Sequence, residues 1–161
     1  MITAMHHSGV VVLDLDRAVE FYRDAIGLKL RGTFEFADAS TAQVVGYEDV
    51  KLKTVEMETP DGQMIELLQY LHPPAPRRPS DDRSLQGASH LAFRVKDIDK
   101  TFGALISKGG IKLNPPVEES AGVKVCYLQD PEGKPPTARW LTLTEAGRLR
   151  WSGPIEQSAF S

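Results

Sequence analysis

Two histidines and one glutamate are the residues of this chain whose types and positions could bind a metal ion. His7 opens the stretch HSGVVVLDLDRAVEFYRDAIGLKL, and His90, 83 residues later, opens HLAFRVKDIDKTFGALISKGGIKL. Glu66 lies inside the apolar run MIELLQY, where a carboxylate is costly unless it is paired or bound to metal. Imidazole and carboxylate groups are common ligands of divalent ions. The simpler alternative is that His7 and His90 are polar residues that cap strands.

The two stretches belong to an internal repeat with the same order of elements. In each copy a short β-branched segment leads to Asp14 or Asp97, a plausible helix N-cap, and then to a helical run of apolar residues that ends at glycine. Three further strands follow, with turns at 60–62 and in the DPEG motif. The repeat predicts an α+β fold of two tandem βαβββ modules that form an open, cup-shaped mixed sheet.

The same repeat predicts the domain boundaries. We expect a single domain over residues 1–145, made of one module at 5–70 and a second at 88–145. The proline-rich, charged segment 71–87 is typical of an exposed linker. Residues 146–161 have no clear periodicity and are expected to form a C-terminal tail.

The composition argues against several classes of partner. The 19 basic and 22 acidic residues give a net charge of −3, which favours neither nucleic acid nor an anionic membrane. We found no apolar run of about 20 residues that could span a membrane, and no secretory signal pattern at the N-terminus. The single cysteine allows no internal disulfide, so we expect a cytoplasmic protein.

Four motifs in order resemble the vicinal-oxygen-chelate superfamily, which includes glyoxalase I, methylmalonyl-CoA epimerase, extradiol dioxygenases and bleomycin resistance proteins. They are DLDRAVEFYRDAIGL, PDGQMIELLQY, SHLAFRVKDID and DPEG, and the resemblance runs from about Met5 to Glu145. It implies paired βαβββ modules, a divalent metal ion, a small-molecule substrate that chelates the ion, and a homodimer.

The resemblance also implies a ligand set. Carried over by position, His7, Glu66 and His90 would bind the metal, which could be nickel, cobalt, zinc, manganese or iron, and Glu66 would also be the catalytic proton acceptor. His6 could replace His7 if the first strand slipped by one residue. If the modules swap between subunits, His7 and Glu66 would meet His90 of the other subunit; pairing within one chain is the alternative.

The fourth ligand of the glyoxalase-like pattern is missing. Alignment of the last strands places Thr142 opposite Glu66, and an alignment without the extra loop residues places Thr137 there. Glu145 is the nearest carboxylate, but a regular strand would direct it to the other face unless a bulge intervened. A three-ligand site would leave about three positions of an octahedral ion for water or a bidentate substrate.

These residues favour a metal-dependent enzyme with lyase, isomerase or dioxygenase chemistry on a small oxygenated substrate. The alternative is a metal-free protein that sequesters a small molecule, as bleomycin resistance proteins do. Glu48 and Asp49 could supply a general base or could be solvated loop charges. Arg94 and Lys124 could bind an anionic group or face outward. Several strand residues could line a cavity or pack in the core: Phe34, Phe36, Met57, Met64, Phe93 and Tyr127.

Overall fold

The structure is a computed structural model of the chain. It describes residues 1–77, 79–80, 82, 84, 86–132 and 138–143, the last of these through the backbone alone. The first module consists of β1 (His7–Val11), α1 (Leu15–Glu20), the π-helix η1 (Phe21–Ile26), β2 (Lys29–Phe36), α2 (Ala39–Val45), β3 (Lys51–Glu58) and β4 (Met64–His72). The second consists of β5 (Ala92–Val95), α3 (Ile98–Ser107), β6 (Ile111–Ser120), β7 (Val123–Gln129) and β8 (Ala138–Leu143). None of the helices in the described ranges is long and apolar enough to cross a membrane.

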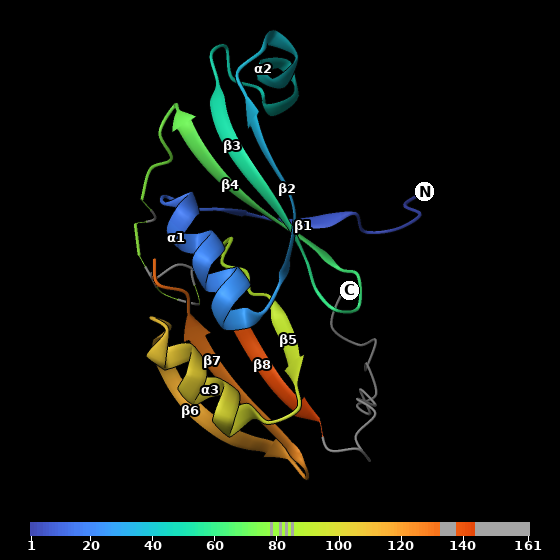
Figure 1. Cartoon of the computed structure of the whole chain (residues 1–161), viewed down its shortest axis with the longest axis vertical. Helices are drawn as coiled ribbons and strands as arrows, with labels where there is room; N and C mark the ends of the chain where they lie inside the picture. The colour runs from blue at the N-terminus through green and yellow to red at the C-terminus, as the bar shows by residue number, and fades with distance from the viewer. Residues whose placement is uncertain (78, 81, 83, 85, 133–137, 144–161) are drawn as a thin grey trace, which may run out of the picture.

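Each module forms its own mixed four-stranded sheet. The strand orders are β1-β4-β3-β2 and β5-β8-β7-β6, and in each sheet the first strand runs parallel to its neighbour while the other pairs are antiparallel. Figure 1 shows the first sheet in the upper half of the molecule and the second in the lower half. The predicted α+β class with paired βαβββ modules is confirmed, and within the described part of one chain the two sheets remain separate.

The helices begin and end where the sequence predicts, with one addition. Asp14 and Asp97 are the N-caps of α1 and α3, and each side chain accepts a hydrogen bond from the backbone N–H three residues later. The first helix continues as η1 and ends at Gly27, whose φ of 91° is a left-handed conformation that suits glycine. The short helix α2 was not predicted, and none of its residues is buried.

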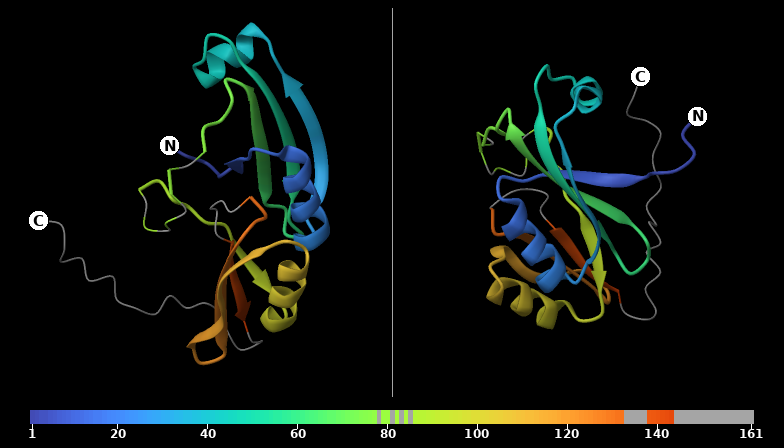
Figure 2. Two further views of the ribbon diagram at one scale, coloured as in Figure 1. Left: turned by 90° about the vertical axis from the view of Figure 1, so that its left-hand side faces the viewer. Right: turned by 45° about the horizontal axis from the view of Figure 1, so that its top comes forward.

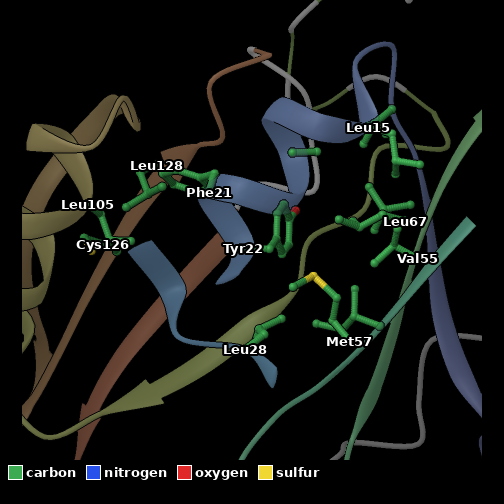
Figure 3. Packing of buried hydrophobic residues seen from close by; sticks show 14 of the residues in the cluster. Leu15, Phe21, Tyr22, Leu28, Val55, Met57, Leu67, Leu105, Cys126 and Leu128 are labelled. Atoms are coloured by element: carbon green, nitrogen blue, oxygen red, sulfur yellow. The ribbon is translucent and has the colours of Figure 1, made fainter. Parts of the chain in front are cut away.

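One hydrophobic cluster holds the two modules together. The helical segment α1–η1 lies between the two sheets in both views of Figure 2, so its side chains can pack against both sheets. Figure 3 shows Tyr22 beside Met57 of the first sheet, and Phe21 beside Leu128 of the second. All four side chains are at most 4% exposed and belong to a single cluster of buried residues. The core is therefore shared between the modules rather than built twice.

The shared core determines which face of each sheet is exposed. In a strand, alternate residues point to opposite sides, so the residues between the buried ones face away from the helices. We call this side the open face of each sheet. On β4, for example, Ile65 and Leu67 are buried on the helix side, and Glu66 between them lies on the open face.

Polar contacts reinforce the junction. The carboxylate of Glu132, in the turn after β7, accepts hydrogen bonds from the backbone N–H of Leu13 at 2.9 Å and of Asp14 at 2.5 Å. Lys108, which follows α3, donates to the backbone carbonyl of Asp24 in η1. Glu132 therefore connects the DPEG turn of the second module to the start of the first helix.

We expect Glu132→Ala to lower the free energy of unfolding by about 1–3 kcal/mol, because two backbone N–H donors lose a charged acceptor. Urea unfolding followed by circular dichroism measures the change. The matched control is Glu48→Ala, which removes an exposed carboxylate from the loop before β3. Equal stability of the two variants would contradict a role for Glu132 in joining the modules.

Candidate functional site

The structure brings two of the three predicted ligands together on the open face of the first sheet. In the parallel pair β1–β4, Gly9 is the register partner of Glu66, and His7 lies two residues before Gly9 on the same face. The Nε2 atom of His7 is 3.4 Å from the Oε2 atom of Glu66. Their side chains are 42% and 21% exposed, so both groups are open to a ligand.

His6 contacts the other nitrogen of the same imidazole. The Nδ1 atoms of His6 and His7 are 2.8 Å apart, and their rings meet edge to face. One of the two nitrogens must donate in this hydrogen bond and the other accept. His6 therefore does not replace His7 beside Glu66; it holds the ring whose Nε2 faces the carboxylate.

Glu56 is a third polar side chain on this face, and no sequence motif pointed to it. In the antiparallel pair β3–β4, Glu56 is the register partner of Glu66, so the two carboxylates share the open face. The side chain of Glu56 makes no hydrogen bond or ion pair with another described residue, whereas that of Glu58 pairs with Arg31 at 3.2 Å. The turn at 60–62 was the available signal, because counting back from it along both strands pairs Glu56 with Glu66.

His90 lies on the second module, apart from this pair. It precedes β5, and its ring packs edge to face on the ring of Tyr127 with centroids 5.8 Å apart. With Arg94 it lines a cavity of about 670 Å³ along β5, which also touches Ser8 and Met64 of the first module. Among the described residues, no three histidine, cysteine or acidic side chains come close enough to hold one metal ion.

The register of β8 corrects the expectation for the missing fourth ligand. The second-module counterpart of Gly9, 83 residues later, is Ala92, and its partner on β8 is Arg139. Arg139, and not Thr142, therefore occupies the position that corresponds to Glu66. Thr142 pairs with Val95 instead, three residues further along the strand. Thr137 and Glu145 lie outside the described residues.

Two of the other charged candidates are engaged away from the open faces. Lys124 donates to Asp99 of α3 at 2.7 Å, so it lies on the helix side of its sheet, and Asp99 raises the pKa of the Lys124 ammonium group. Asp49 is 3.6 Å from His72 and 86% exposed. Glu48 is also exposed. These positions fit the interpretation of Glu48 and Asp49 as surface charges.

The apolar candidates divide between the core and the open faces. Met57 is fully buried, and Phe93 packs against the shared core. Phe34 and Phe36 stack on the open face of the first sheet with ring centroids 6.1 Å apart. Cys126 is fully buried, and burial, with Asp99 nearby, raises the pKa of its thiol to about 11. The thiol is therefore protonated at neutral pH and is a poor candidate for a nucleophile.

Two curated relatives have sequences similar to this chain. A 2-epi-5-epi-valiolone epimerase from an Actinomyces species is 31% identical over 114 residues, which cover 68% of this chain and 61% of the epimerase. The match therefore spans less than two thirds of that relative's length. A lactoylglutathione lyase from Haemophilus influenzae is 29% identical over 130 residues, which cover 79% of this chain and 84% of the lyase.

Solved structures have the same fold. A glyoxalase family protein from Bacillus cereus superimposes with a TM-score of 0.82 at 26% identity, over 89% of this chain and 97% of that one. Glyoxalase I from Zea mays superimposes with a TM-score of 0.62 at 20% identity, over 85% of this chain and 43% of that one.

The model of a sequence family matches most of the chain. This match agrees with the strand order, the paired modules and the similar proteins. The match covers residues 4–134. The chain belongs to the Glyoxalase/Bleomycin resistance protein/Dioxygenase superfamily.

Proposed function

We propose that the chain is a metal-dependent isomerase or lyase that moves a proton on a small oxygenated substrate. The observation that carries the proposal is the contact of His7 with Glu66 at 3.4 Å, with Glu56 as the register partner of Glu66 on the same open face. An imidazole and two carboxylates are thus gathered on one exposed surface. They are the groups from which a metal site and a general base can be made.

Two of the donor atoms that a divalent ion would need lie side by side, on His7 and Glu66. His7 would bind through Nε2, because its Nδ1 is engaged by His6, and Glu66 would bind through the oxygen that faces His7. Two carboxylates directly opposite each other across a strand pair repel, and positive charge at Glu66 would relieve that repulsion. When bound, such an ion would polarise an oxygen of the substrate and so acidify the neighbouring C–H group.

Glu56 is the proposed proton acceptor. Glu66 would be engaged as a ligand, whereas Glu56 stays free to accept a proton because it has no partner among the described residues. It is half-buried on β3, so it is partly shielded from water while it remains within reach of a substrate on the open face. The conjugate acid could return the proton to the same carbon or to a neighbouring one, as an isomerase requires.

His90 would complete the site from a second copy of the chain. β1 and β5 are edge strands, each with a single neighbouring strand in the described part of its sheet. Edge strands offer backbone groups that another strand can cover. If β1 of one copy lies along β5 of the other, His7 and Glu66 of the first copy approach His90 of the second, and a homodimer contains two such sites.

The similar proteins support proton transfer over oxygen chemistry. One relative is named an epimerase and another a lyase, and epimerisation beside a carbonyl group requires that a proton leave and return. A metal-free protein that sequesters a small molecule is the alternative, in which His7 and Glu66 form an ordinary surface ion pair. The metal content of the purified protein separates the two.

We expect the purified protein, without an affinity tag, to contain about one divalent ion per chain. Glu66→Ala should weaken metal binding by more than about 100-fold, since even outer partners of metal ligands are worth about 10- to 100-fold. Elemental analysis and a competing chelator measure both quantities. Glu58→Ala, on the same face but paired with Arg31, is the matched control and should retain metal. Absence of metal from the wild type after exposure to each candidate ion would favour the sequestering protein.

A hybrid dimer tests the origin of the third ligand. His7→Ala and His90→Ala should each lose metal as homodimers. In their co-expressed heterodimer, one site joins the intact His7 of one subunit to the intact His90 of the other. We therefore expect about one ion per heterodimer, measured by native mass spectrometry. Metal-free heterodimers would contradict a site shared between subunits.

Glu56→Gln should retain metal but lose proton transfer. The expected loss of rate is about 10²- to 10⁴-fold, the usual contribution of a general base. Exchange of the α-hydrogen of hydroxyacetone or 2-hydroxycyclohexanone in D₂O, followed by NMR, measures it. Glu58→Gln should exchange at the wild-type rate. If the metal-loaded wild type exchanges neither probe, the proposed activity is wrong; if Glu56→Gln exchanges normally, another group is the base.

A further inference from the structure

The row of residues that crosses the first sheet at Glu66 has glycine at both ends. Gly9 on β1 pairs with Glu66 on β4. Glu66 in turn pairs with Glu56 on β3, and Glu56 pairs with Gly32 on β2. Direct register partners share a face, so no side chain stands on either side of the two carboxylates in this row. Neither glycine has a positive φ, so the backbone conformation does not require glycine at these positions.

The ring of Phe34 occupies the space above Gly32. A Cβ atom placed on Gly32 would lie 2.7 Å from Cζ and 2.8 Å from Cε2 of Phe34. These distances are well inside the contact distance of two carbon atoms, which is about 3.5–4.0 Å. The ring therefore folds back along β2 to the row of the carboxylates, where Gly32 is the register partner of Glu56. The missing side chain of Gly32 makes room for this ring next to the position of the proposed proton acceptor.

The part of the open face around Phe34 is apolar. Phe34 is 43% exposed and stacks on the half-buried Phe36. Thr54, two residues before Glu56 on β3, lies between Phe34 and Leu68 in the register. Thr54 is only 2% exposed, and its hydroxyl oxygen has no hydrogen-bond partner among the described residues. The side chains around Thr54 thus keep water away from a hydroxyl group, and the exposed surface that they form is hydrophobic.

We propose that Phe34 binds an apolar alkyl or aryl group of the substrate, carried by the carbon that loses its proton to Glu56, and so determines substrate specificity. This inference rests on the proposed function, because Glu56 and Glu66 fix which part of the substrate lies beside the ring. A group that packs on the ring withdraws apolar surface from water, and an aromatic group adds a favourable contact between rings. The substrate class is then a hydroxy or oxo compound whose reacting carbon bears an apolar substituent.

Three 2-hydroxy acids that differ only in the group on carbon 2 test the inference. Glycerate carries a hydroxymethyl group, 2-hydroxybutyrate an ethyl group of similar size, and 3-phenyllactate a benzyl group. Titration calorimetry of Co²⁺-loaded protein should show that 2-hydroxybutyrate binds more tightly than glycerate, and that 3-phenyllactate binds about 10- to 100-fold more tightly than glycerate, since part of a phenyl ring becomes buried. Equal binding of the three acids, or a preference for glycerate, would overturn the inference.

Variants assign the preference to the ring. Phe34→Ala should remove most of it. Gly32→Ala should have a similar effect although the ring is still present, because the new Cβ atom displaces it. Adding Gly32→Ala to Phe34→Ala should cause no further loss, because no ring is left to displace. Co²⁺ uptake and circular dichroism report whether each variant is folded.

Leu30→Ala is the matched control. Leu30 is also 43% exposed and lies on the same strand as Phe34, but its register partner is the buried Met57, so it lies on the helix side of the sheet. This variant should keep the preference of the wild type. An unchanged preference in Phe34→Ala, or an equal loss in Leu30→Ala, would contradict a specific role for the ring.

Failure of the proposed function is distinguishable from failure of this inference. If wild-type protein takes up no Co²⁺, the metal-dependent function is wrong. Titration of the same three acids into metal-free protein then still measures the preference for an apolar group. Loss of that preference in Phe34→Ala and Gly32→Ala supports the role of the ring, and its absence from the wild type overturns it.

Discussion

The burial of one face of each sheet against the helices is the constraint on which the rest of the structure depends. In the cluster around α1 and η1, Tyr22 packs beside Met57 of the first sheet. Phe21 packs beside Leu128 of the second sheet. Once those side chains are buried, the alternation of each strand exposes the residues between them. The polar groups on the open faces are therefore held by the packing of their apolar neighbours, and their positions are as well determined as the core itself.

Much of this arrangement could be predicted because the two halves of the chain have similar sequences that can be compared with each other. The repeat at a spacing of 83 residues predicted both helix caps and the paired modules. The contact of His7 with Glu66 agrees with the placement of both residues on one site, which the family resemblance implied. Where the two copies align without gaps, the sequence predicted the order of the elements correctly.

The errors arose where register depends on more than alternation. The sequence KPPT before the last strand lengthens the second copy, and alignment through it shifted the strand by three residues, from Arg139 to Thr142. An odd shift moves a residue to the other face of a sheet, so a small alignment error changed the chemistry assigned to the site. Glu56 was missed for a different reason: its role depends on its cross-strand partner rather than on any motif that it belongs to.

The separation of packing from chemistry on alternate residues has a consequence for how such a chain can diversify. Residues on the helix side of both copies pack in one common core, so a substitution in either half affects the packing of the other. Positions outside this core are freer to differ, so the first copy has Glu66 at a register position where the second has Arg139. After a gene duplication, the two halves can thus acquire different polarity while their shared scaffold stays the same, and a symmetric ancestor becomes an asymmetric binding surface.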